Sequence, residues 1–141
     1  MATKVGSGIS EKLMGTKLKD QLFGLGGDDN LKGGKGDDVL AGGTGSDQLT
    51  GGTGADTFVF NKGDFTKKIV DTVTDFTLKD GDILQFAKGV VKSVGDVVGK
   101  AAASKDGNDT IINLGDGNKI VLKDVKLADF VKNPHDHIVV G

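Results

Sequence analysis

A nine-residue repeat constrains the fold of this chain more than any other feature of its sequence. Three copies follow one another without a gap: GGKGDDVLA, GGTGSDQLT and GGTGADTFV, which begin at Gly33, Gly42 and Gly51. The frame extends backwards through the weaker copies GLGGDDNLK, GTKLKDQLF and GSGISEKLM. The eighth position is apolar throughout: Leu13, Leu22, Leu31, Leu40, Leu49 and Phe58. A turn-forming hexapeptide before each apolar position predicts a coil whose strands are about three residues long.

The positions of the repeat have separate physical roles. Glycines at the first, second and fourth places permit positive φ, so the chain can turn sharply and direct backbone carbonyls into a common pocket. Because one turn of the coil uses two repeats, we expect each turn to stack about 4.8 Å from the turn two repeats away. Stacked carboxylates repel unless a cation lies between them. The carboxylates come from the sixth place: Asp29, Asp38, Asp47 and Asp56.

A site of carbonyl and carboxylate oxygens, without nitrogen or sulfur, selects calcium over zinc or copper. The alternative interpretation of the composition is a flexible glycine-rich linker. A linker has no reason to keep a large apolar residue in phase over successive units, so we favour the coil.

Composition excludes several other classes of protein. A chain of 141 residues has room for one domain, and without cysteine it forms neither disulfides nor zinc–thiolate sites. All 18 basic residues are lysine, and Arg, Trp and Tyr are absent, so nucleic-acid binding is not expected. The amino terminus, MATKVGSGISEK, lacks the apolar segment of a cleaved signal peptide. No apolar run approaches the roughly 20 residues of a membrane span, and we expect no membrane partner.

The three adjacent units match the RTX nonapeptide GGxGxDxUx. Their continuation, GADTFVFNKGDF…DTVTDFTLKDGDILQF, resembles the carboxy-terminal domains of serralysin-type metalloproteases and RTX lipases and the R-modules of mannuronan epimerases. The resemblance covers about residues 6–86. It implies an all-β fold: a right-handed parallel β-roll of nonapeptide repeats, continued by a short-stranded, β-sandwich-like C-terminal part.

The resemblance also divides the chain. We expect a disordered N-terminus over residues 1–5 and a single domain over 6–141. Within that domain, residues 6–23 would be degenerate capping repeats, 24–60 the calcium-binding repeats and 61–141 a C-terminal extension of the roll.

In proteins of this kind the second and fourth residues of each turn offer carbonyls and the sixth offers its side chain. The turn from Gly24 should face the turn from Gly42, and the turn from Gly33 should face that from Gly51. A last site is closed by two aspartates beyond the repeats, at a spacing one residue longer than that found here. The resemblance thus implies several calcium ions, held by Leu25, Gly27, Asp29, Gly34, Gly36, Asp38, Gly43, Gly45, Asp47, Gly52, Gly54, Asp56, Asp64 and Asp71.

The first two units depart from the repeat. Ile9 and Leu18 stand at the fourth place, where a carbonyl-lined turn requires glycine. We expect these apolar side chains to pack inward as a cap. Asp20 is then either a ligand opposite the turn from Gly33 or no ligand at all.

Beyond Phe60 the period changes. The segments IVDTVTDF and DILQF predict short strands, VVKSVGDVVGKAAAS an amphipathic helix, and TIINL-GDGN-KIVL a hairpin. Turn chemistry is the expected role of Asp80, Asp82 and Asp116. His135 and His137 are expected at the surface, since an H-x-H pair without a third ligand is a weak metal site. The apolar tail resembles an uncleaved export signal, although such tails also form edge strands.

No nucleophile with a base and an orienting group is apparent, so we expect a non-catalytic module. The first hypothesis is a folding and secretion domain at the C-terminal end of a type I secreted bacterial protein. It would fold on extracellular calcium, export through the type I secretion apparatus without a cleaved signal peptide, remain a monomer and be covalently linked to a catalytic domain. The alternative is an R-module that binds the anionic polysaccharide alginate through lysines: Lys17, Lys19, Lys32, Lys35, Lys67, Lys68 and Lys119.

Overall fold

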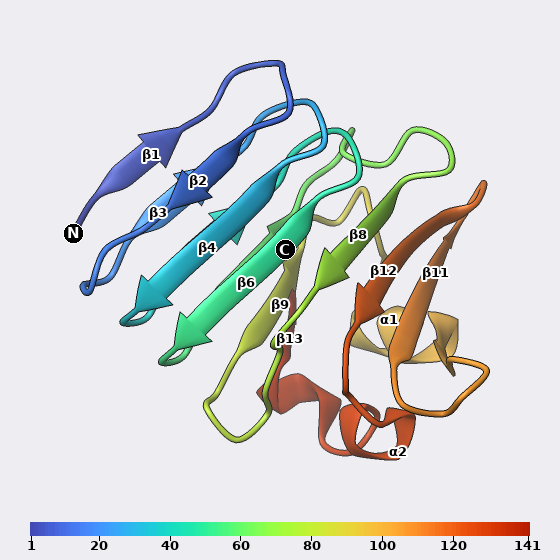
Figure 1. The fold of residues 1–141 in the computed structure, drawn as a ribbon. Helices are drawn as coiled ribbons and strands as arrows, with labels where there is room; N and C mark the ends of the chain where they lie inside the picture. Colours follow the sequence, from blue (N-terminus) through green and yellow to red (C-terminus); the bar gives the residue numbers. More distant parts are fainter.

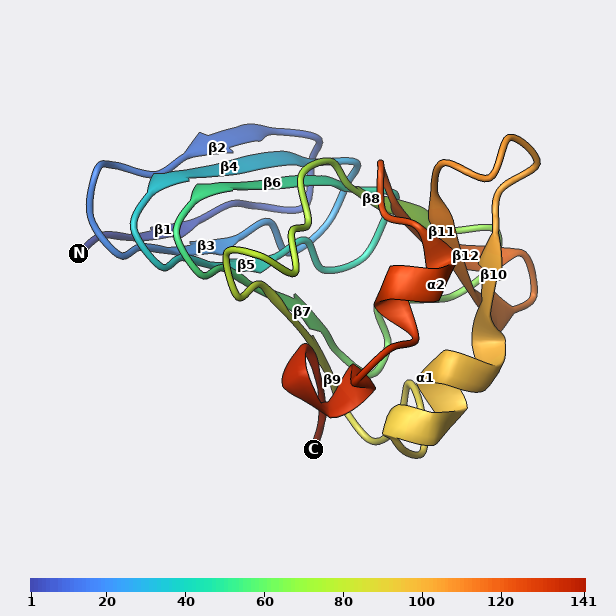
Figure 2. The ribbon, with the colours of Figure 1, turned by 90° about the horizontal axis from the view of Figure 1, so that it is seen from below.

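The computed structural model describes residues 1–141, and its repeats form short parallel strands that alternate between two sheets (Figure 1). One sheet has six strands, in the order β1 (Thr3–Val5), β3 (Gln21–Phe23), β5 (Val39–Ala41), β7 (Thr57–Phe60), β9 (Ile83–Phe86) and β13 (Ile138–Val140). The other has seven, in the order β10 (Ala101–Ala103), β11 (Thr110–Gly115), β12 (Asn118–Leu122), β8 (Val70–Val73), β6 (Gln48–Thr53), β4 (Asn30–Lys35) and β2 (Lys12–Met14). The two sheets lie face to face as layers (Figure 2).

The eighth position of each repeat forms the core between the sheets. Along the six-stranded sheet, Leu22 pairs with Leu40 and Leu40 with Phe58. Along the other sheet, Leu31 pairs with Leu49. All five side chains are fully buried. Residues two repeats apart therefore stack, which confirms the predicted coil of two repeats per turn and the all-β fold.

The N-terminal end differs from expectation in two ways. Residues 3–5 are strand β1, paired in parallel with β3, and not a disordered leader, because the backbone of β3 offers an unpaired edge. The apolar cap is also wrong: Ile9 is 69% exposed and Leu18 61% exposed. The fourth-place residues of these two turns lie at the margins of the sheets with their side chains exposed, whereas the eighth-place Leu22 reaches the core.

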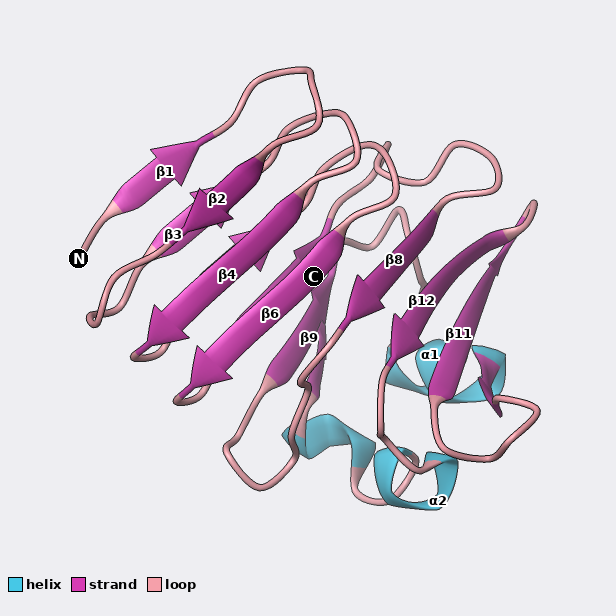
Figure 3. Cartoon of the chain, in the orientation of Figure 1, coloured by secondary structure: helices cyan, strands magenta, loops and turns pink.

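The second half closes the other end of the roll. Strands β8 and β9 continue the parallel sheets, and the predicted hairpin forms from β11 and β12. Asp116 and Gly117, at its tip, both have positive φ. Helix α1 (Val94–Lys100) confirms the predicted helix, but it stops at Lys100 because Ala101–Ala103 joins the sheet as β10. Figure 3 shows how little of the chain is helical.

The C-terminal segment packs against this closed end. Short helices, α2 (Leu127–Phe130) and η1 (Pro134–Asp136), precede β13, which pairs with β9. The apolar tail is thus a sheet strand. His137 is buried, contrary to expectation: its Nε2 lies 2.6 Å from the Phe130 carbonyl oxygen and its ring packs against Phe76 and Phe130. No helix of the chain has the length and apolarity of a membrane span.

Candidate metal sites at the edges of the roll

Two rows of carboxylates run along the edges of the roll, where the turns stack. At one edge the backbone N–H of Asp20 donates to Asp38 Oδ1 at 2.7 Å, and that of Asp38 donates to Asp56 Oδ1 at 2.9 Å. At the other edge the N–H of Asp29 donates to Asp47 Oδ1 at 2.8 Å. Each sixth-place carboxylate therefore uses one oxygen to bind the preceding turn, 18 residues back in the sequence.

The second carboxylate oxygen distinguishes two kinds of turn. In the degenerate turns the second residue donates its own N–H to the carboxylate: Ser7 to Glu11 and Thr16 to Asp20. In the glycine turns the Oδ2 atom is buried and has no hydrogen-bond partner. This holds for four residues: Asp29, Asp38, Asp47 and Asp56. A buried, unpaired carboxylate oxygen is costly, and a cation is the group that would compensate it.

The backbone conformation follows the same division. The second and fourth residues of the glycine turns have positive φ, which in one turn is 111° at Gly34 and 97° at Gly36. Leu25 adopts φ 75°, although it carries a side chain, so the turn from Gly24 has the same shape. Ser7 and Thr16 do not have positive φ. Positive φ at the second and fourth places, whether at glycine or at Leu25, thus accompanies an unpaired sixth-place Oδ2.

Backbone carbonyls of one turn lie directly against the next turn. Cβ atoms built on Gly52 and Gly54 would collide with the carbonyl oxygens of Gly34 and Gly36, and a Cβ on Gly33 would lie 2.5 Å from the Gly51 oxygen. The same relation joins the turn from Gly24 to the turn from Gly42, where the carbonyl oxygens of Leu25 and Gly27 face Gly43 and Gly45. The predicted pairing of turns is present in the structure.

Carbonyl oxygens of the second and fourth places thus point toward the next turn, and Asp38 Oδ2 lies near the Gly51 carbonyl oxygen, since both are within 2.5 Å of the Cβ built on Gly33. Nowhere do three or more His, Cys, Asp or Glu side chains come together in a way that could hold a metal. An ion at these turns would be held largely by backbone oxygens, a donor set that suits calcium.

Burial perturbs the carboxylates of both rows. Burial is the main cause that raises the pKa of Asp47 and of Asp56 to about 7, and neighbouring carboxylates add to it. Burial likewise raises the pKa of Asp29 and of Asp38. For Asp20, burial is outweighed by hydrogen bonds from Thr16 and Ala2, so its pKa is lowered. Negative charge is thus unfavourable at the sixth place of the glycine turns and stabilised at Asp20 in the degenerate turn.

The two aspartates beyond the repeats lie beside Asp47. Asp71 Oδ1 accepts from the Asp47 N–H at 2.8 Å, and Asp64 Oδ2 accepts from the Asn61 N–H at 2.7 Å. Both residues are buried, and the charges of Asp64 and Asp28 both raise the pKa of Asp47. Burial raises the pKa of Asp71 to about 8. The structure places both residues at the edge where the resemblance implied a last site.

Other acidic residues are accounted for differently. Asp20 Oδ2 accepts from both the N–H and the hydroxyl of Thr16, which occupy its two lone pairs, and Oδ1 accepts from the Ala2 N–H, so Asp20 has no unpaired oxygen directed at the turn from Gly33. Asp82 continues the row from Asp56, and its Oδ2 caps its own turn through the Thr77 N–H, as turn chemistry predicts. Asp80 and Asp116 are exposed. Sequence reasoning missed Asp75, because nothing in the nonapeptide pattern extends to its position.

Comparison with known proteins identifies the repeat and the fold. A family model of the RTX calcium-binding nonapeptide repeat matches residues 14–49 and 23–58. No curated protein sequence matches the chain. Among solved structures, the extracellular lipase LipA from Serratia marcescens is similar, with a TM-score of 0.77 and 26% identity over 99% of this chain. The chain spans only 21% of that lipase.

Two solution structures from the Azotobacter vinelandii mannuronan C5-epimerase are also similar. The AlgE6R2 subunit has a TM-score of 0.63 and 28% identity, over 91% of this chain and 91% of that one. The AlgE6R3 subunit has a TM-score of 0.58 and 26% identity, over 92% of this chain and 84% of that one.

Proposed function

We propose that this chain, whose residues 14–58 consist of RTX calcium-binding nonapeptide repeats, is a module that folds when calcium binds and that serves as a non-catalytic part of a secreted bacterial protein. RTX nonapeptide repeats bind calcium. Coupling of that binding to folding is supported by the buried, unpaired Oδ2 atoms of the four glycine turns, because these atoms are costly until an ion neutralises them.

The free energy that calcium binding can supply favours a fold that depends on calcium. With sites of about 0.1 mM affinity, about 2 mM calcium contributes roughly 1.8 kcal/mol per ion. Three such ions would supply about 5 kcal/mol, which is comparable to the whole stability of a small domain. Submicromolar calcium would contribute almost no free energy of folding. The chain would therefore stay unfolded inside the cell and fold outside it.

Removal of calcium tests this function. Circular dichroism of the chain in excess chelator should show little strand content, and addition of millimolar calcium should restore a β-rich spectrum and a cooperative thermal transition. Magnesium at the same concentration is the control, because it prefers a smaller octahedral site and retains its waters. Identical spectra and melting temperatures with chelator and with calcium would contradict calcium-coupled folding.

We extend this proposal to the role of the module in a larger secreted protein. Similarity to an extracellular lipase, of which this chain spans a fifth, supports a secreted parent protein in which the module is covalently linked to a catalytic domain. Disorder at cytosolic calcium suits passage through a type I secretion apparatus without a cleaved signal peptide. The module itself would be a monomer that binds several calcium ions, with no nucleic-acid or membrane partner. Fusion of the chain to a reporter, followed by measurement of export with and without a type I apparatus, tests this role.

A second candidate function is binding of alginate as an epimerase R-module. The observation that favours it is the match to two epimerase subunits along nearly their whole length. The candidate lysines are exposed but do not form one stripe. Lys17, Lys19 and Lys35 belong to turns at one edge, whereas Lys68 lies at the other edge, where its N–H donates to the Asp116 carbonyl.

Nuclear magnetic resonance titration of the calcium-loaded chain tests this second function. Oligouronates should shift amide signals near the exposed lysines at low salt, and the shifts should weaken as salt screens the charges. Neutral oligosaccharides are the control. Absence of any shift with millimolar oligouronate would leave the folding module as the better description.

A further inference from the structure

The last glycine turn, Gly51–Asp56, has potential calcium ligands, but no further repeat turn follows it to supply the other half of a site. Its carboxylate row continues to Asp82, and Asp56 is 1% exposed with an Oδ2 that has no partner. In the earlier turns the corresponding oxygen lies next to the following glycine turn. After Asp56 the following turn is the segment between β8 and β9, which has no glycine at the matching places.

Asp75 supplies a carboxylate at this position. Its Oδ1 accepts from the Gly51 N–H at 2.9 Å, and its Oδ2 accepts from the Gly52 N–H at 2.8 Å. Gly51 is also the residue whose missing side chain leaves room for Asp56 Oδ2. Asp56 Oδ2 and the Asp75 carboxylate therefore both lie against Gly51.

We infer that Asp56 and Asp75, together with backbone carbonyls of the Gly51 turn, bind a further calcium ion at the end of this edge of the roll. The inference rests on the proposed calcium-dependent function. A carboxylate has about four lone-pair sites, and two N–H bonds leave Asp75 able to coordinate an ion as well. Two adjacent carboxylates, one with a buried unpaired oxygen, are disfavoured without a cation and favoured with one.

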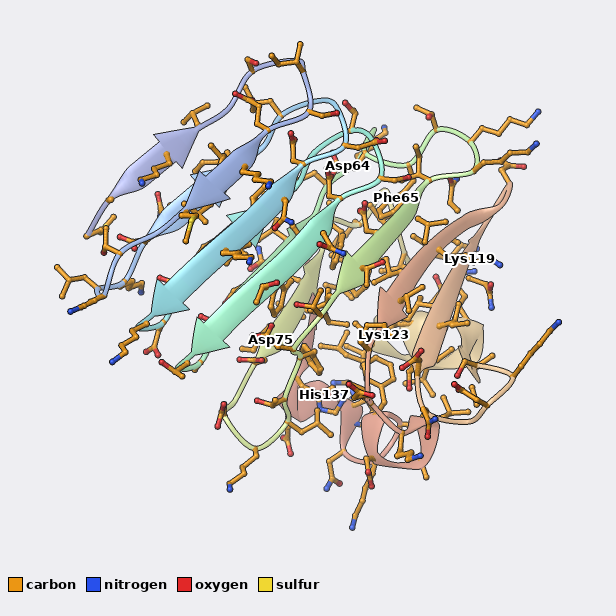
Figure 4. The ribbon with its side chains drawn as sticks, viewed as in Figure 1. Asp64, Phe65, Asp75, Lys119, Lys123 and His137 are labelled. Atoms are coloured by element: carbon orange, nitrogen blue, oxygen red, sulfur yellow. The ribbon has the colours of Figure 1, made fainter.

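This site would be the counterpart of the one at Asp64 and Asp71. Figure 4 shows Asp64 and Asp75 near opposite ends of the strands, so each edge of the roll ends at an aspartate that lies outside the repeats. At each edge the last repeat turn donates an N–H to an aspartate from the continuation of the chain: Asp47 to Asp71 at one edge and Gly51 to Asp75 at the other. The pattern of nine cannot name Asp75, because the intervening segment has a different length.

Counting bound ions tests the inference. Native mass spectrometry of the full chain with calcium should show one ion fewer for Asp75→Asn than for the unaltered chain. Asp80→Asn is the matched control, since Asp80 is exposed on the same turn and its loss removes the same charge. Asp80→Asn should retain every ion. An equal ion count in Asp75→Asn and the unaltered chain would overturn the inference and identify Asp75 as a purely backbone-capping residue.

A second measurement covers the case in which Asp75→Asn does not fold. Crystals of the unaltered chain grown with calcium, measured at long wavelength, should show an anomalous peak between the Asp56 and Asp75 carboxylates. Peaks at the other turns without one here would overturn the inference and leave the proposed function intact. Absence of all peaks would instead contradict the proposed function.

Discussion

Whether an aspartate contributes to calcium binding depends on whether one of its carboxylate oxygens is unpaired. Asp38 is sixth in its repeat and is buried with a free Oδ2, whereas Asp37 is fifth and exposed, with Oδ1 bound to the Ala55 N–H at 2.8 Å. Asp38→Asn removes a charged interaction of about 1.5–3 kcal/mol and should raise the calcium midpoint of folding roughly tenfold or more. Asp37→Asn retains an acceptor for Ala55 and should change the midpoint little. Calcium titrations followed by circular dichroism compare the two, and equal midpoints would show that the register is wrong.

Asp20 provides a related comparison at the same edge. Its sequence position matches that of Asp38, but its Oδ2 is occupied by Thr16. Asp20→Asn should therefore leave the number of bound ions unchanged and lower only the stability of the first coil. Isothermal titration calorimetry would reveal a lost ion if Asp20 were a ligand.

Glycines of the repeat are required for a steric reason as well as a conformational one. An alanine at Gly33 would place its Cβ against the Asp38 carboxylate and 2.5 Å from the Gly51 carbonyl oxygen. Gly33→Ala should therefore weaken calcium binding and lower the melting temperature. Gly8→Ala is the control, because nothing lies within 4 Å of its built Cβ. Differential scanning calorimetry with calcium should separate the two variants; equal melting temperatures would contradict the close approach.

At the scale of elements, each strand is stabilised mainly by the strands above and below it. Leu40 of β5 is fully buried and pairs with Leu22 and Phe58. Leu40→Ala should lower the free energy of unfolding by about 2–5 kcal/mol. Met14→Ala on the terminal strand β2, where Met14 is 62% exposed, should have a much smaller effect. Chemical denaturation at saturating calcium measures both.

The repeat predicted these elements well, because one position in nine determines both the strand and its register. Leu22, Leu40 and Phe58 stack as expected for this reason. The sequence predicted less at the two ends. Apolar side chains at the fourth place of the first two repeats predict a cap, but Ile9 and Leu18 are exposed because these turns lie at the margins of the sheets. The H-x-H pair predicts a surface position for His137, but its ring is buried against Phe130 and against Phe76, which is distant in sequence. Asp75 could not be found, since its role depends on a hydrogen bond to Gly51 across two strands.

For the whole molecule, raised carboxylate pKa values make acid a partial substitute for calcium. Burial is the main cause that raises the pKa of Asp47 and Asp56 to about 7 and of Asp71 to about 8, above the ordinary value of 3.8. The folded chain therefore binds protons more tightly than the unfolded chain. Stability from this source is fully present below about pH 4 and is lost as the pH rises through about 7 to 8.

Strand content measured by circular dichroism in calcium-free buffer, as a function of pH, checks this prediction. The calcium-free chain should be more stable at pH 5 than at pH 8, whereas calcium affinity should fall at pH 5 because the ion must displace these protons. A calcium-free chain that is more stable at pH 8 would contradict the burial of these carboxylates.

The 18-residue reach of the carboxylate hydrogen bonds has a consequence for the evolution of the molecule. Successive nonapeptides are related by a screw operation that exchanges the two edges, so deletion of one unit would move every preceding turn to the opposite edge into an equivalent environment. Roll length can therefore change in steps of nine residues, each adding or removing half a coil, without redesign of the closed C-terminal end. An insertion of one residue within a strand, by contrast, would turn the core leucine of that strand to the opposite face of the sheet.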